Sequence, residues 1–104
     1  MMLLPKRTPI RDRKWLDFLR TQPCIVTQES GEVEPAHLRL LGSGGTSMKP
    51  GDDLAVPLHW RLHRMQSELG EGRAWLTFAN EYPDFLFRLL LRDAKRSYQM
   101  WRAA

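Results

Sequence analysis

The chain has 104 residues, a single cysteine, a formal charge of +4 and 42% hydrophobic residues. Its length allows one small domain with a modest core, and its composition is too hydrophobic for a disordered chain and too poor in cysteine for a disulfide or a multi-cysteine zinc site. Because no apolar run approaches the about 20 residues that cross a membrane, we expect a cytoplasmic protein without a membrane partner.

The first part of the chain predicts a helix followed by two short strands. Residues 11–20 indicate a short helix, because their aromatic and leucine residues form a partly amphipathic stripe. The β-branched residues of 24–27 favour a strand, and 33–38 predict a second one after a turn.

The second part of the chain predicts a loop, a strand and helices. Residues 41–53 are glycine-rich and predict a loop, whereas the apolar residues 54–58 suit a brief strand. From His59 to Gly70 the apolar spacing becomes helical, and a second helix is predicted over 73–81. A third helix is predicted after Pro83, because apolar residues recur there every four positions, at Leu86, Leu90, Ala94 and Tyr98. These elements predict a small α+β domain.

Basic residues gather near both ends of the chain. Residues 5–20 hold six basic side chains against two acidic ones, and residues 84–102 hold five against two. Such clusters favour a polyanionic partner, but a solvated helix surface explains them equally well.

All three histidines lie in the middle of the chain. His37 ends a predicted strand, while His59 and His63 are four residues apart, so that a helix would place both rings on one face. Asp52 precedes that helix across the short strand. Imidazoles and carboxylates are the groups that hold divalent cations and activate water. Three histidines are nevertheless ordinary for this length, so a purely structural role stays open.

Five short motifs occur in an order that resembles a known family. They are Pro23-Cys24-Ile25-Val26, Ala36-His37, the glycines Gly42 to Gly45, Lys49-Pro50-Gly51-Asp52 and Val56-Pro57-Leu58. This order resembles the HNH endonucleases, also called ββα-metal nucleases, and looks most similar to their phage and prophage branch of Ref-type recombination-enhancing nucleases. The resemblance covers about residues 22–70.

The resemblance implies a fold and a reaction. It implies a small ββα-metal core over 22–70 in a single domain, with a basic arm and helix over 1–21 and two C-terminal helices within 71–104. The activity implied is metal-dependent hydrolysis of phosphodiester bonds in single- or double-stranded DNA, during phage recombination or DNA processing.

The resemblance also implies roles for individual residues. His37 matches the general base that deprotonates the attacking water, a task that suits a neutral imidazole. His63 and Asp52 match ligands of one Mg²⁺ or Mn²⁺ ion, with His59 as an additional candidate ligand. The DNA backbone would be bound by Arg39, Lys49, Arg61 and Arg64.

Two departures from the family pattern bear on stability and activity. Many relatives bind a structural zinc through cysteines where this chain has Thr27 and His59, so we expect no structural zinc, with the helical tail supplying the missing stability. Relatives often carry a further histidine where Ser67 stands here. This second departure leaves two alternatives open: a nucleic-acid-binding recombination accessory protein that cleaves poorly, or a phage protein–protein adaptor whose partner helix lies in 73–101.

Overall fold

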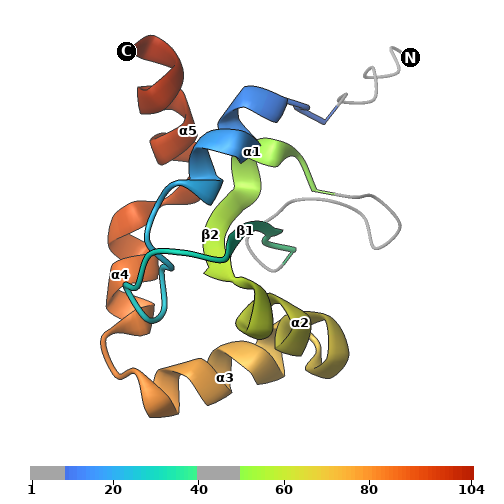
Figure 1. The fold of residues 1–104 in the computed structure, drawn as a ribbon, viewed down its shortest axis with the longest axis vertical. Coiled ribbons are helices and arrows are strands. Elements are labelled where there is room, and N and C mark those ends of the chain that lie inside the picture. The colour runs from blue at the N-terminus through green and yellow to red at the C-terminus, as the bar shows by residue number, and fades with distance from the viewer. Residues whose placement is uncertain (1–8, 40–49) are drawn as a thin grey trace, which may run out of the picture.

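A two-stranded antiparallel sheet lies among helices (Figure 1). The computed structural model describes residues 9–39 and 50–104. β1 (Val33–His37) pairs with β2 (Ala55–His59), so that Val33 lies opposite His59 and His37 opposite Ala55. α2 (Trp60–Leu69) follows β2 directly, which gives the chain order β1, β2, α2. The predicted α+β class is confirmed, and the two predicted strands that pair lie within one residue of their expected bounds.

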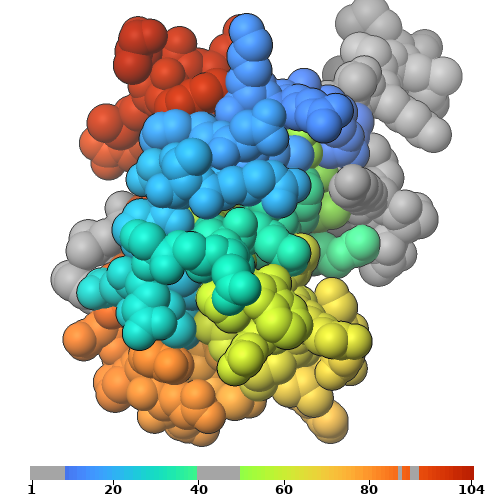
Figure 2. All heavy atoms as spheres, in the orientation of Figure 1, coloured from blue at the N-terminus to red at the C-terminus, as the bar shows by residue number. Residues whose placement is uncertain are grey.

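α1 (Arg13–Arg20) packs against both strands of the sheet. It begins after Asp12, whose side chain accepts a hydrogen bond from the Trp15 backbone N–H at 3.2 Å. Such an N-cap satisfies a backbone donor that the first helical turn leaves without a partner. Trp15 and Leu19 are the buried residues of this helix. Figure 2 shows α1, in blue, and the segment that follows it covering much of the sheet on this face.

The prediction of a strand over 24–27 is wrong, because these residues form a turn. The Gln28 N–H donates to the Cys24 carbonyl, and the Ile25 N–H donates to Pro57 of β2 at 2.9 Å. Cys24, Ile25 and Val26 are buried in the core beside the sheet. Burial therefore accounts for their apolar character, and the same composition is also typical of strands.

Arg88 holds this turn from the C-terminal half of the chain. Its Nε donates to the Ile25 carbonyl at 3.0 Å and its Nη2 donates to the Val26 carbonyl. Because hydrogen bonds from a charged donor are stronger than neutral ones, Arg88→Ala should lower the free energy of unfolding by about 2–3 kcal/mol. Chemical denaturation measures this loss. Arg73→Ala, at an exposed position of a neighbouring helix, is the control, and an equal effect of both variants would contradict the prediction.

Three helices follow α2, where the sequence predicted two. They are α3 (Glu71–Glu81), α4 (Phe85–Arg92) and α5 (Ala94–Ala103). The predicted third helix is broken at Asp93, which has a φ of 43° and whose side chain accepts from the Arg96 N–H at 3.4 Å. An aspartate tolerates this conformation and caps the next helix. Apolar residues therefore recur every four positions although one helix ends and another begins at Asp93.

The buried side chains form two clusters. The larger one joins the turn at 24–26, the sheet, α3, α4 and the first residue of α5, Ala94. The smaller one joins α1, β2 and α5 through Trp15, Leu19, Ala55 and Tyr98. Figure 1 shows α1 and α5 together at the same end of the molecule. Within residues 9–39 and 50–104, no helix has the length and apolar character to cross a membrane.

Candidate functional site

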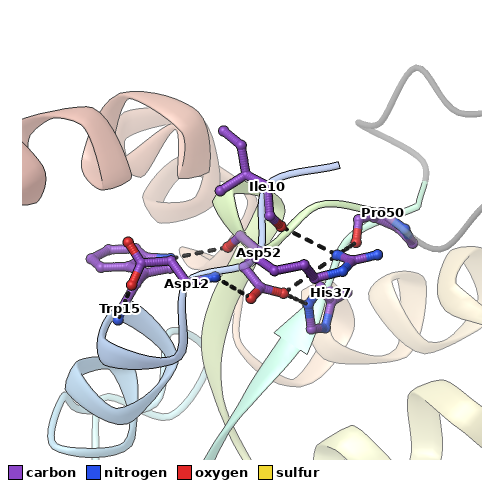
Figure 3. A network of polar contacts seen from close by, with 7 residues as sticks. Ile10, Asp12, Trp15, His37, Pro50 and Asp52 are labelled. Carbon is purple, nitrogen blue, oxygen red and sulfur yellow. Dashed lines mark hydrogen bonds and ion pairs between the residues drawn. The ribbon is translucent and has the colours of Figure 1, made fainter. Parts of the chain in front are cut away.

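His37 and Asp52 form the closest pair of candidate residues. His37 is the last residue of β1, and Asp52 opens the short 3₁₀ helix η1 (Asp52–Leu54) that precedes β2. The His37 Nε2 lies 2.8 Å from the Asp52 Oδ1, as Figure 3 shows. The sequence motifs thus bring together an imidazole and a carboxylate that are 15 residues apart in the chain.

The Asp52 carboxylate is buried, and both of its oxygens have partners. The residue is 4% exposed. Its Oδ2 accepts the Asp12 backbone N–H at 2.8 Å, and its Oδ1 also lies 3.5 Å from Arg11 Nη1. Burial raises the pKa of Asp52, but the hydrogen bonds from His37 and Asp12 and the charges of His37 and Arg11 outweigh it, so the pKa lies below its usual value of 3.8. The carboxylate is therefore ionised at neutral pH.

The N-terminal segment fixes the backbone around Asp52. The Asp52 N–H donates to the Ile10 carbonyl at 2.8 Å, and the Trp15 Nε1–H donates to the Asp52 carbonyl at 3.0 Å. Arg11 donates to the Pro50 carbonyl at 2.7 Å. The segment before α1 and the first turn of α1 therefore position the acid of the pair, a role that the sequence did not reveal.

His63 is held by a carboxylate of its own. Its Nδ1 lies 2.8 Å from Glu34 Oε1, joining α2 to β1. A histidine that binds a metal commonly donates its other ring N–H to a carboxylate in this way. The sequence did not indicate Glu34, because nothing in the spacing of the chain links it to a residue 29 positions later.

His59 does not share a helix face with His63, so this prediction is wrong. His59 is the last residue of β2 and caps α2, with its Nδ1 accepting from the Arg61 N–H at 3.1 Å. Its Nε2 lies 3.4 Å from Glu32. Both ring nitrogens therefore have partners apart from the other two histidines.

A cavity of about 540 Å³ lies between the end of β1, α2 and the start of α3. His37 and His63 both line it, whereas His59 and Asp52 are not among its lining residues. Its other polar lining residues are Arg39, Gln66, Ser67 and Glu71. Three of the predicted site residues, His37, Arg39 and His63, therefore line the cavity, and Asp52 is bonded to His37.

Gln66 and Glu71 fix the backbone on this side of the cavity. The Gln66 Nε2 donates to the His37 carbonyl at 3.1 Å and to Glu71 Oε1 at 3.0 Å. The same Glu71 oxygen accepts the Arg39 N–H at 2.8 Å. The sequence predicted no role for either residue, since their contacts depend on how α2 meets α3. Together they fix the backbone from His37 to Arg39.

The four predicted backbone-binding residues lie in different places. Arg39 lines the cavity. Arg61 and Arg64 are exposed on α2 outside the lining; Arg61 lies over the Trp60 ring, and Arg64 pairs with Glu68 at 3.3 Å. Lys49 and the glycines at 42–45 lie outside the described residues.

The sequence of this chain matches one known protein family. Residues 1–83 match the sequence model of a family described as protein of unknown function (DUF968). The chain belongs to the DUF968 family. No curated protein and no solved structure matches it. The DUF968 match includes His37, Asp52 and His63 and ends before α4, so that α4 and α5 lie beyond it.

Proposed function

We propose that this DUF968 chain is a metal-dependent endonuclease of the HNH type that hydrolyses DNA phosphodiester bonds in phage or prophage recombination or DNA processing. The observation that carries the proposal is the His37–Asp52 pair at the edge of a cavity that His63 also lines. The order β1, β2, α2, with one histidine ending the first strand and another on the helix, supports it further.

His37 serves as the general base in this proposal. Because an ionised carboxylate only accepts hydrogen bonds, the neutral imidazole donates its Nε2–H to Asp52 and keeps its lone pair on Nδ1. Nδ1 then accepts a proton from water as the water oxygen bonds to phosphorus and the bond from phosphorus to the leaving sugar oxygen breaks. Asp52 therefore orients the base, rather than holding a cation as the resemblance implied.

His63 is the residue that would hold the Mg²⁺ or Mn²⁺ ion that the resemblance implies. The Glu34 carboxylate on its Nδ1 leaves Nε2 as the donor for a cation. Within the described residues, no group of three or more histidine, cysteine, aspartate or glutamate side chains is arranged to hold a metal. The donor set therefore fits a cation shared with substrate phosphate and water, and not one caged by protein alone. When bound, such a cation stabilises negative charge on the phosphate and the leaving oxygen.

Supercoiled plasmid and single-stranded DNA, incubated with the protein in Mg²⁺ or Mn²⁺ and in EDTA, test the proposal. We expect nicking that EDTA abolishes, and faster nicking in Mn²⁺, because an imidazole ligand favours the softer cation. DNA retention without any metal-dependent cleavage would overturn the nuclease and favour the accessory-protein alternative. If no DNA is retained even at low salt, only the adaptor alternative remains.

Contacts with phosphates predict a strong salt dependence of DNA binding. Arg61 and Arg64 are exposed one turn apart on α2, the helix that carries His63. If each binds one phosphate, the double variant Arg61→Ala/Arg64→Ala should lower the slope of log K against log salt by about 2. Fluorescence anisotropy at several salt concentrations measures the slope. The control is Arg73→Ala on α3, and an unchanged slope in the double variant would exclude these contacts.

A further inference from the structure

α5 reaches the candidate site through a chain of hydrogen bonds. The Tyr98 hydroxyl donates to Asp12 Oδ2 at 2.9 Å. The Asp12 backbone N–H donates to Asp52 Oδ2, and Asp52 Oδ1 binds His37. Two residues therefore separate His37 from a helix that lies beyond the DUF968 match.

Asp12 is held from two sides, and this fixes the direction of its N–H. Its Oδ1 accepts the Trp15 N–H at the start of α1, and its Oδ2 accepts the Tyr98 hydroxyl. Arg102 donates to the same hydroxyl oxygen at 3.2 Å, which favours the hydroxyl as a donor toward Asp12. With both carboxylate oxygens bound, Asp12 has little freedom to rotate away from Asp52.

Aromatic packing holds Tyr98 against α1. Tyr98 is 3% exposed, and its ring meets the Trp15 ring edge-on, with centroids 5.5 Å apart. Trp101 lies 5.3 Å from the same Trp15 ring. Because Trp15 also donates to the Asp52 carbonyl, this cluster fixes Asp52 by a second route. The phenol ring and its hydroxyl thus have separable tasks: the ring packs, and the hydroxyl binds Asp12.

We propose that Tyr98 is a positioning residue, which aligns the His37–Asp52 pair by holding Asp12 through its hydroxyl. The inference rests on the proposed function for its effect on cleavage, and Tyr98 acts on the pair through Asp12. The α5 helix then does more than stabilise the fold. Through Asp12 it helps to hold the general base of the proposed reaction in place, although it lies outside the segment that matches the family.

Tyr98→Phe tests the inference, because it keeps the ring and removes the hydroxyl. Tyr82→Phe is the matched control: it deletes the same group from the only other tyrosine of the chain, which packs against the larger core cluster. Amide hydrogen exchange is measured by NMR at Asp12 and at Ile25, whose N–H is bonded to Pro57 on that larger cluster. In Tyr98→Phe we expect exchange at Asp12 to accelerate about tenfold, equal to about 1.4 kcal/mol, with Ile25 unchanged.

Cleavage kinetics give the second readout. Because Tyr98 is buried away from the cavity lining, its loss should lower kcat about tenfold and leave KM for DNA unchanged. Arg102→Ala keeps the hydroxyl and should have a smaller effect on both readouts than Tyr98→Phe.

Unchanged exchange at Asp12, or equal acceleration at Asp12 and Ile25, would overturn the positioning role, since the second result means a general loss of stability. A kcat that matches the wild type would do the same. If the wild type cleaves no DNA, the proposed function fails, and exchange at Asp12 still decides whether Tyr98 holds the pair.

Discussion

His37→Ala should reduce metal-dependent nicking by about 10²- to 10⁴-fold, the range contributed by a positioned general base. Among the described histidines, only His37 both lines the cavity and binds a buried carboxylate, that of Asp52. Without it, the other described partners of the Asp52 carboxylate are Arg11 and the Asp12 N–H, and neither can accept a proton from the attacking water. Initial nicking rates on supercoiled plasmid measure the loss, and circular dichroism checks that the variant folds.

His59→Asn is the matched control for this experiment. It also removes one imidazole, but from a residue outside the cavity, and asparagine can still cap α2 by accepting from the Arg61 N–H. Its nicking rate should stay within about twofold of the wild type, as expected for a substitution away from buried partners. If His37→Ala nicks as fast as His59→Asn, His37 is not the base.

Local patterns predicted most of the secondary structure. The amphipathic stripe of α1, the two strands and the helix after His59 follow from spacing and from residues that end helices, because each depends on neighbours in the chain. The two errors have different causes. The turn at 24–26 is apolar because α4 and the sheet bury it, and a local pattern does not contain such packing between distant segments. The helix break at Asp93 leaves the apolar spacing unchanged on both sides, so the spacing alone does not reveal the break.

The candidate site was predictable as a set of residues and not as a set of contacts. The ordered motifs singled out His37, Asp52 and His63, and the structure places all three around or directly behind one cavity. The resemblance grouped Asp52 with His63, whereas the carboxylate binds His37. That pairing depends on Asp12, 40 residues earlier in the chain. Glu34 went unnoticed for the same reason, since its partner His63 lies across the sheet on α2.

Asp52→Asn should lower kcat by about 10²- to 10⁴-fold while leaving the protein folded. The carboxylate can only accept from His37, which keeps the imidazole proton on Nε2 and the lone pair on Nδ1. An asparagine amide can instead donate to Nε2, which places the ring proton on Nδ1 and removes the base. ¹⁵N NMR of the His37 ring reports the change of tautomer directly, without reference to cleavage. Asp53→Asn, the same change at the adjacent carboxylate, is the control.

The same substitution should change how stability depends on pH. Since the folded pKa of Asp52 lies below the unfolded value of 3.8, its ionised form stabilises the folded protein above that value, and this stabilisation is lost as the pH falls through the folded pKa. At pH 7 the wild type should therefore be more stable than Asp52→Asn by about 1.5–3 kcal/mol, the range for hydrogen bonds to a charged group. Urea unfolding between pH 7 and pH 3 should show this difference shrinking below pH 4. A difference that stays constant down to pH 3 would mean that the charge of Asp52 contributes nothing to stability, and that Arg11, His37 and the Asp12 N–H do not favour its ionised form.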